Sequence, residues 1–159
     1  MIVILLSDSL CAFPISEKKM SSRFTWPVRV YFEDTDAGGV VFYGNYLKFY
    51  ERARTEWLRS LGIGQQFLKE AYGILFVVKN VSVDYRRSAV LDDALQVTSE
   101  VAWMKGASLG FEQGVWRGDT LLSSAKVTIV CVDRQTMRPV PIPGDVAEKM
   151  VAVRRETGE

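Results

Sequence analysis

The hydrophobic period of this chain changes at Asn45, and that change limits its possible folds more than any other feature. Beyond it, bulky or apolar residues recur every three to four positions: Tyr46, Phe49, Tyr50, Ala53 and Trp57. This spacing places them on one face of an α-helix. Asn45 is the expected N-cap, and Gly62 stands just past the expected end. The apolar arc is wide, so a broad surface must cover it.

Strand-type patterns fill most of the remaining chain. Ahead of the helix, Val28, Val30 and Phe32 occupy alternate positions, as on one face of a strand. Behind it, β-rich or alternating runs predict strands at 74–85, 95–103, 109–116 and 125–132. Because these strands follow one another with only short turns between them, an antiparallel meander is expected.

Short helices are predicted at 65–71 and 145–153, and turns at 105–107 and 117–119. One strand, one long helix and then a run of strands are typical of an α+β fold. We therefore predict an antiparallel sheet of about five strands wrapped around the long helix.

The length of 159 residues suits a single domain. We expect residues 1–22 to be an extension outside the fold and 23–155 to form the domain. The apolar start is interrupted after six residues and has no basic residue ahead of it. It is therefore too short for a membrane span and unlike a signal peptide. Met20 is a possible alternative start, which would make residues 1–19 dispensable.

The composition excludes several kinds of site. The chain has no histidine, so histidine-dependent catalytic triads and histidine zinc sites are excluded. Cys11 and Cys131 provide neither a disulfide framework nor a metal-binding spacing, and we expect both to be reduced in a cytoplasmic protein. A net charge of +1 argues against nucleic acid or an anionic membrane as a whole-surface partner. No metal or redox cofactor is expected.

Residues 106–110 read Gly-Ala-Ser-Leu-Gly and match the G-x-S-x-G pattern of serine hydrolases. That pattern needs a strand-to-helix turn and a histidine base. Here the segment lies between two predicted strands in a chain without histidine. We therefore interpret it as a hairpin turn.

The strongest candidate for chemistry is the acidic loop that carries Glu33, Asp34 and Asp36 ahead of the predicted helix. A solvated acidic loop is the simpler interpretation. However, the Gly38-Gly39 pair allows close approach of a ligand to the backbone, and the helix start offers free N–H groups to negative charge. A carboxylate there can act as general base or nucleophile while the N–H groups hold an oxyanion. Both roles stay open, and a reactive substrate such as a thioester suits so weak a base.

The stretch 28–59, above all 33–41 and 51–54, resembles the hotdog-fold acyl-CoA thioesterases of the 4-hydroxybenzoyl-CoA thioesterase family. It is most similar to the YbgC-type branch associated with the Tol–Pal system. The resemblance covers about 25–143, including the Pro-Val-Pro-Ile-Pro ending. It implies a hotdog fold, hydrolysis of an acyl-CoA to free acid and coenzyme A, and a homodimer or homotetramer with active sites between subunits.

The resemblance also implies roles for individual residues. The second aspartate of the motif, Asp36, corresponds to the catalytic aspartate, and the backbone N–H of Tyr43 polarises the thioester carbonyl. The backbone N–H of Gly44 is a weaker candidate for a second donor. Some YbgC-type members carry histidine at or next to the Tyr43 position. If the oxyanion contact is made by the backbone, the absence of that histidine from this chain is harmless. If a member uses the imidazole, this chain lacks the corresponding contact.

Glu51 is a secondary catalytic candidate, because a helix glutamate is catalytic in distant hotdog thioesterases. Its simpler role is an ion-paired helix residue beside Arg52, Arg54 or a neighbouring subunit. Tyr31, Phe42, Tyr46 and Phe76 are candidates for an acyl pocket or for the core. No particular cation is assigned to the phosphates of coenzyme A.

Two other functions remain as alternatives. The first is a non-catalytic hotdog module that binds acyl carrier protein or lipid-synthesis enzymes. Asp36 argues against it, because a pure binding module has no chemical need for that carboxylate. The second is an enoyl-CoA hydratase, which ranks last because its usual Asp/His pair is impossible here.

Overall fold

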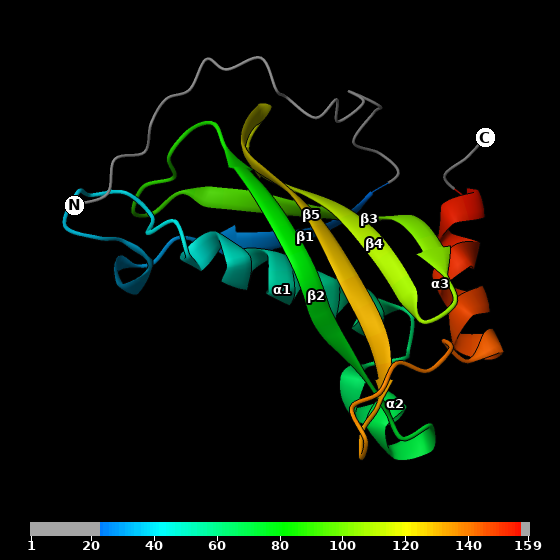
Figure 1. Ribbon diagram of the computed structural model, residues 1–159. Helices are drawn as coiled ribbons and strands as arrows, with labels where there is room; N and C mark the ends of the chain where they lie inside the picture. The colour runs from blue at the N-terminus through cyan, green and yellow to red at the C-terminus, as the bar shows by residue number, and fades with distance from the viewer. Residues whose placement is uncertain (1–22, 157–159) are drawn as a thin grey trace.

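The computed structural model describes residues 23–156, and side chains up to residue 152. An antiparallel sheet of five strands curves around one long helix, α1 (Figure 1). This is the α+β, hotdog arrangement predicted above. The strands are β1 (Phe24–Arg29), β2 (Ile74–Tyr85), β3 (Ala94–Lys105), β4 (Ser108–Arg117) and β5 (Thr120–Asp133). The helices are α1 (Asn45–Ser60), α2 (Gln65–Ala71), α3 (Gly144–Glu156) and the short 3-10 helix η2 (Phe32–Asp34).

The strand order in the sheet is β1-β3-β4-β5-β2. β1 and β2 flank α1 in the sequence yet occupy opposite edges of the sheet. α1 contacts β1, β3 and β4, so it covers the part of the sheet nearer to the β1 edge (Figure 1). The segment between β1 and α1, which contains the acidic loop, lies at one end of the layered structure.

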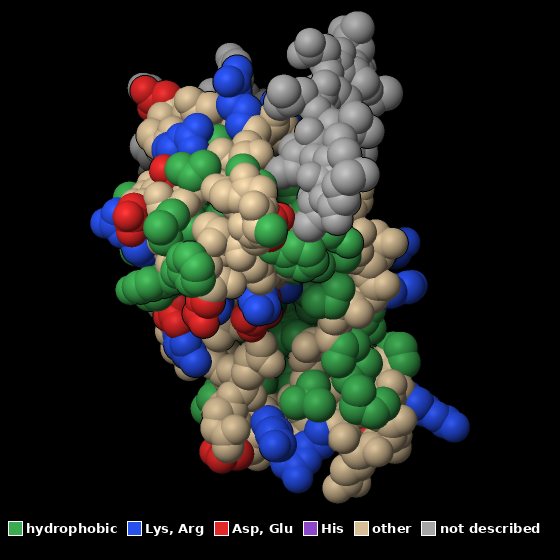
Figure 2. All heavy atoms as spheres, turned by 90° about the vertical axis from the view of Figure 1, so that its left-hand side faces the viewer, with side chains coloured by type: hydrophobic (Ala, Val, Ile, Leu, Met, Phe, Trp, Pro, Cys, Tyr) green, Lys and Arg blue, Asp and Glu red, His purple; other side chains and the backbone are tan. Residues whose placement is uncertain are grey.

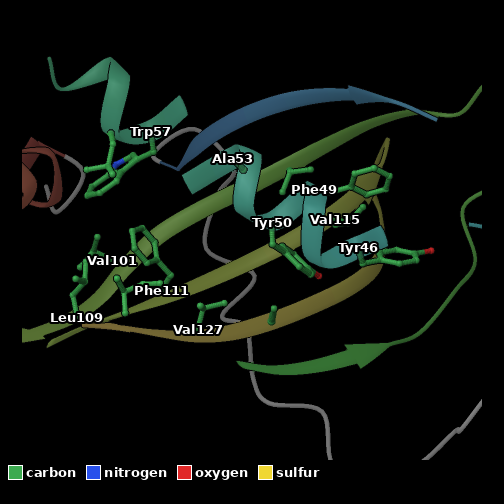
Figure 3. Close-up of a cluster of buried hydrophobic side chains, with 14 of the residues drawn as sticks. Tyr46, Phe49, Tyr50, Ala53, Trp57, Val101, Leu109, Phe111, Val115 and Val127 are labelled. Carbon is green, nitrogen blue, oxygen red and sulfur yellow. The ribbon is translucent and has the colours of Figure 1, made fainter. Parts of the chain in front are cut away.

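The predicted apolar face of α1 is buried. Tyr46, Phe49, Tyr50, Ala53 and Trp57 are each at most 3% exposed and point toward the sheet (Figure 3). The Trp57 ring meets the ring of Phe111 edge-on, with centroids 5.1 Å apart. Full burial of one large apolar side chain contributes about 1.5–3 kcal/mol. This face therefore accounts for much of the attachment of α1.

A polar cluster around Gln113 of β4 crosses the same layer. Its Nε2 donates to the Tyr50 carbonyl at 3.0 Å and to Ser99 Oγ at 2.7 Å. Its Oε1 accepts a hydrogen bond from Arg54 at 2.8 Å. The Tyr50 hydroxyl donates to Ser123 Oγ at 2.7 Å. These directional bonds specify where α1 sits along the sheet, which apolar contacts alone would not do.

Two local predictions are wrong. Val28 and Val30 are buried as expected, but Phe32 is 81% exposed, because β1 ends at Arg29 and the chain turns into η2. Asn45 is the first residue of α1 rather than its N-cap, which is Gly44. The Asn45 side chain donates instead to the Asp34 carbonyl at 2.9 Å.

The other elements agree closely with the sequence. Gly62 follows α1 with φ +72°, and its N–H donates to the Arg59 carbonyl at 2.9 Å. The helix at 65–71 is confirmed, and the closing helix extends beyond the predicted 145–153. Ser108 begins β4 directly after a turn between antiparallel strands, so the G-x-S-x-G match is a hairpin turn.

The predicted extension at 1–22, which includes Cys11, lies outside the described residues. Within the described part of the chain, Cys131 is a free, buried thiol whose pKa burial raises to about 11. None of the helices in residues 23–156 combines the length and apolar character that crossing a membrane requires.

Candidate active site

The acidic loop closes on itself through backbone bonds. Thr35 and Val41 form an isolated antiparallel bridge. Inside it, the Asp36 N–H donates to the Val40 carbonyl at 2.9 Å, and the Gly39 N–H donates to the Asp36 carbonyl at 3.0 Å. Gly39 has φ +75°, a conformation that glycine adopts without strain. The loop is therefore a tight turn of defined shape.

Asp36 is half-buried near the start of this turn. Its Oδ1 accepts the Gly38 N–H at 2.8 Å. Its second carboxylate oxygen has no hydrogen-bond or ion-pair partner within residues 23–156. A Cβ on residue 38 would lie 3.0 Å from Asp36 Oδ1, a closer contact than a Cβ atom ordinarily makes. One oxygen thus fixes the carboxylate, and the other is available.

The neighbouring acidic residues have different environments. Asp34 is only 7% exposed, and its Oδ2 accepts the Tyr31 N–H at 2.8 Å. Its carbonyl accepts the Phe42 N–H and the Asn45 side chain, both at 2.9 Å. Glu33 is exposed on η2. Asp34 therefore attaches the acidic loop to the start of α1.

The start of α1 presents two free donors. The backbone N–H groups of Tyr43 and Gly44 have no acceptor among the described residues. Each of these N–H groups shares a peptide unit with the carbonyl of the preceding residue, and both of those carbonyls accept hydrogen bonds. The Phe42 carbonyl accepts the Asn45 N–H at 2.9 Å, and the Tyr43 carbonyl accepts the Tyr85 hydroxyl at 2.9 Å. Free N–H groups at a helix N-terminus are suited to an anion.

The loop and the helix start are held next to each other. The Thr35–Val41 bridge joins the chain one residue before Asp36 to the chain two residues before Tyr43. Paired residues in such a bridge have Cα atoms about 4.5–5.5 Å apart. The predicted catalytic carboxylate and the predicted oxyanion donors therefore belong to one compact unit of backbone.

Exposed apolar side chains surround this unit. Tyr31, Phe32, Phe42, Tyr43 and Leu47 are between 38% and 81% exposed. Figure 2 shows apolar side chains gathered on this side of the molecule, with acidic ones beside them. Of the four aromatic residues considered for an acyl pocket, Tyr31 and Phe42 are thus at the surface. Tyr46 is core, with its hydroxyl accepting the Ala89 N–H at 3.0 Å.

Glu51 belongs to a different part of the molecule. It lies six residues after Asn45, the first residue of α1, which places it about 9 Å farther along the helix axis. It lines a cavity of about 100 Å³ between α1, α2, α3 and the sheet, with Arg54, Phe76, Phe111 and Met150 among the other lining residues. Asp36 does not line this cavity.

Within the described residues Glu51 forms no ion pair, and its Oε1 accepts the Thr55 hydroxyl at 2.7 Å. An ion pair with a neighbouring subunit stays a prediction. The neighbouring Arg54 is largely buried, and loss of hydration lowers its pKa, an effect that Glu51 partly opposes. The cavity thus combines a mainly apolar lining with one cation and one carboxylate on the same side.

Two features near the site were not predicted from the sequence. One is the hydrogen bond from Tyr85 to the Tyr43 carbonyl, and the other is the Gln113 cluster under the middle of α1. Tyr85 ends a β-rich run with no local sign that its hydroxyl has a specific partner. Both interactions join residues far apart in sequence, so no spacing pattern indicates them.

Comparison with known proteins shows the family of the chain. Residues 30–150 match the thioesterase-like superfamily. The chain is 50% identical over 127 residues to the acyl-CoA thioesterase YbgC of Haemophilus influenzae, covering 80% of this chain and 93% of that protein. It is 48% identical over 127 residues to the acyl-CoA thioester hydrolase YbgC of Escherichia coli O6:H1, covering 79% and 94%.

Solved structures show the same likeness. A probable thioesterase from Bartonella henselae superposes with a TM-score of 0.73 at 31% identity, covering 76% of this chain and 99% of that one. The family match spans most of the described fold and includes both the acidic loop and α1. The chain therefore belongs to the thioesterase-like superfamily of hotdog proteins, within its YbgC-type branch.

Proposed function

We propose that this protein is an acyl-CoA thioesterase that hydrolyses the thioester to a free acid and coenzyme A. The observation that carries the proposal is the pair of free N–H groups at Tyr43 and Gly44, which the Thr35–Val41 bridge joins to the loop that carries Asp36. One oxygen of the Asp36 carboxylate accepts the Gly38 N–H, and the other is available. Its YbgC relatives carry the same activity in their names.

In the proposed reaction, the thioester carbonyl oxygen accepts the Tyr43 N–H, with the Gly44 N–H as a second donor. These bonds strengthen as the oxygen becomes negative, which lowers the barrier to attack. Because the donors are backbone groups, the absence of histidine beside Tyr43 does not remove them. The dipole of α1 adds to the stabilisation of the oxyanion.

Asp36 has two possible chemical roles. As a general base, it takes a proton from water while the water oxygen bonds to the carbonyl carbon; the C–S bond then breaks and the thiolate takes up a proton. As a nucleophile, its oxygen displaces the thiolate to form an acyl anhydride, which water hydrolyses to the free acid and regenerated Asp36. Both routes need one accessible carboxylate oxygen, and both suit an activated thioester.

The homodimer or homotetramer expected from the resemblance is part of the proposal. β2 lies at a sheet edge, is 12 residues long and pairs with a neighbour on one side. Val78 and Val81 on this strand are 52% and 40% exposed. A long edge strand with exposed apolar residues is suited to pairing with a second copy. Acyl carrier protein remains a candidate alternative carrier, and a cytoplasmic location stays a prediction.

The proposal is tested by thiol release from short, long and aromatic acyl-CoAs. Asp36→Asn should lower kcat by at least ~10²-fold, the lower range for loss of a general base. Glu51→Gln should stay close to wild type. Unchanged kcat in Asp36→Asn would overturn the assignment, and a collapse in Glu51→Gln alone would move catalysis to the cavity. No turnover of any thioester, with tight binding of acyl carrier protein, would favour the non-catalytic module.

A further inference from the structure

Tyr85 makes a bond that the reaction as described above does not use. It is the last residue of β2, and its hydroxyl donates to the Tyr43 carbonyl at 2.9 Å. Its ring is fixed edge-on between two aromatic rings of the helix start. The centroid of Tyr85 is 5.3 Å from that of Tyr46, at an interplanar angle of 82°, and 6.3 Å from that of Tyr43, at 88°.

The bonded carbonyl belongs to the same peptide unit as the Gly44 N–H. A peptide unit is planar and trans, so its C=O and N–H point in opposite directions. A donor that fixes the Tyr43 carbonyl therefore also fixes the direction of the Gly44 N–H, away from Tyr85. A hydrogen bond to the carbonyl also polarises the unit and makes its N–H a stronger donor.

The helix itself does not hold this peptide. In a regular α-helix the Tyr43 carbonyl would accept the N–H of Leu47, four residues on. Here the Leu47 N–H donates to the Gly44 carbonyl at 3.2 Å instead. The Tyr85 hydroxyl is the donor that the described chain supplies to the Tyr43 carbonyl. Residue 44 is glycine, which by itself restricts the backbone least.

We propose that Tyr85 is a positioning residue that aims the Gly44 N–H, and with it the helix start, at the thioester oxyanion. This inference rests on the proposed function, and it makes Gly44 a working second donor. Tyr85 touches no reacting atom and acts only through the Tyr43–Gly44 peptide.

The hydroxyl is protonated under the conditions in which the enzyme would work. Burial raises the pKa of Tyr85 above its usual 10.0, with Tyr46 and Tyr43 adding to the effect. Tyr85 therefore donates throughout the neutral range, and its contribution should not change with pH there.

The main test is Tyr85→Phe, which removes the hydroxyl and keeps the ring packing. We expect kcat to fall by about tenfold or more, up to the ~10²-fold that loss of an oxyanion donor costs. KM should change little, and the kcat–pH profile should keep its shape. Tyr72→Phe is the matched control, because it removes a tyrosine hydroxyl that bonds to Asp145 at the start of α3. It should keep wild-type kcat.

A double-mutant cycle tests the route of action. Gly44 has φ −66°, which proline allows, so Gly44→Pro removes the N–H with the backbone near its present angle. Gly44→Ala is its control: either residue places a Cβ 2.8 Å from Phe42 Cε1, on an exposed and movable ring, but alanine keeps the N–H. Tyr85→Phe should cost much less in the Gly44→Pro background than in wild type or Gly44→Ala.

Wild-type kcat in Tyr85→Phe would overturn the inference, and so would a higher KM with unchanged kcat. If Tyr85→Phe does not fold, equal kcat in Gly44→Pro and Gly44→Ala would overturn it. Asp36→Asn is measured in parallel. If Asp36→Asn is inactive and Tyr85→Phe is not impaired, only the inference fails; if Asp36→Asn has full activity, the proposed function fails with it.

Discussion

At the scale of single residues, Gly38 bears most directly on the Asp36 carboxylate. Its N–H holds Asp36 Oδ1 at 2.8 Å, and a Cβ at this position would lie 3.0 Å from the same oxygen. A side chain on residue 38 would therefore push the Asp36 carboxylate by a few tenths of an ångström away from the N–H that fixes its Oδ1. The carboxylate would keep its charge but lose its position.

We predict that Gly38→Ala lowers kcat by about tenfold or more, because small displacements of a reacting group are costly. Gly144→Ala is the control, since a Cβ there meets no atom within 4 Å. Thiol release and thermal unfolding are measured for both variants. A Gly38→Ala enzyme that keeps wild-type kcat would contradict the proposed role of this contact.

Single residues of the site differ in how far the local sequence predicts their contacts. The residue pattern predicts a loop with three carboxylates ahead of a helix, and the structure shows that loop and that helix. The choice of Asp36 among the three carboxylates rests on the family resemblance and stays a prediction. Asn45 was expected to cap the helix with its side chain, but Asp34 offers a carbonyl that competes successfully for it. The hydroxyl of Tyr85 finds its acceptor 42 residues away, so no local pattern could indicate that bond.

At the scale of elements, α1 is attached to the sheet by apolar packing and by polar hydrogen bonds. The two kinds of contact differ in how well the local sequence predicts them. Its apolar face was predictable, because a period of 3.6 residues is a local property of the sequence. The Gln113 cluster was not, because Gln113 lies on β4 and bonds the Tyr50 carbonyl 63 residues away. A polar residue in an alternating strand looks like a surface position until the opposing helix is known.

We predict that Gln113→Leu destabilises the protein by about 2–4 kcal/mol, since it leaves the largely buried Arg54 guanidinium and the Ser99 hydroxyl without their partner. Urea unfolding monitored by tryptophan fluorescence measures the change. Gln66→Leu, on the exposed face of α2, should cost less than about 0.5 kcal/mol. Equal unfolding midpoints for the two variants would rule out the proposed contribution of the cluster.

The proposed interface between subunits lies along the edge strand β2. Val81→Asp should lower the mass of the proposed oligomer, to that of a monomer if it is a homodimer, because two copies paired along β2 would place like charges close together. Val90→Asp is matched in exposure, since both valines are 40% exposed, but Val90 lies in the loop before β3. Light scattering after gel filtration gives the mass. The same mass for both variants would exclude β2 as the interface.

At the scale of the whole molecule, one cysteine thiol and three tyrosine hydroxyls make the free energy of unfolding depend on alkaline pH. Burial raises the pKa of Cys131 from 9.0 to about 11, and it raises the pKa of Tyr46, Tyr50 and Tyr85 above 10.0. Above pH 9 the unfolded chain therefore releases protons that the folded chain still holds. These groups leave the free energy of unfolding unchanged below pH 9 and reduce it as the pH rises toward 11.

We predict a steep alkaline loss of stability, to which Cys131 contributes up to about 3 kcal/mol at its upper end. In Cys131→Ala the unfolding free energy should start lower, because a buried atom is lost, but it should decline less steeply with pH. Urea titrations on either side of pH 9 measure both slopes. Parallel slopes for the variant and wild type would show that ionisation of Cys131 is not coupled to unfolding.

The sheet order has a consequence for how the molecule forms. β1 pairs with β3 across a separation of about 70 residues. The first strand therefore cannot pair until the chain has closed the long loop between it and β3. The acidic loop depends on the same late segment, because the Val41 N–H donates to the Ala89 carbonyl and the Val30 N–H donates to the Asp93 carbonyl. Closing so long a loop is slow relative to forming a helix. During refolding, helical signal should therefore return before thioesterase turnover, and enzyme activity would report on the last long-range closure of the chain.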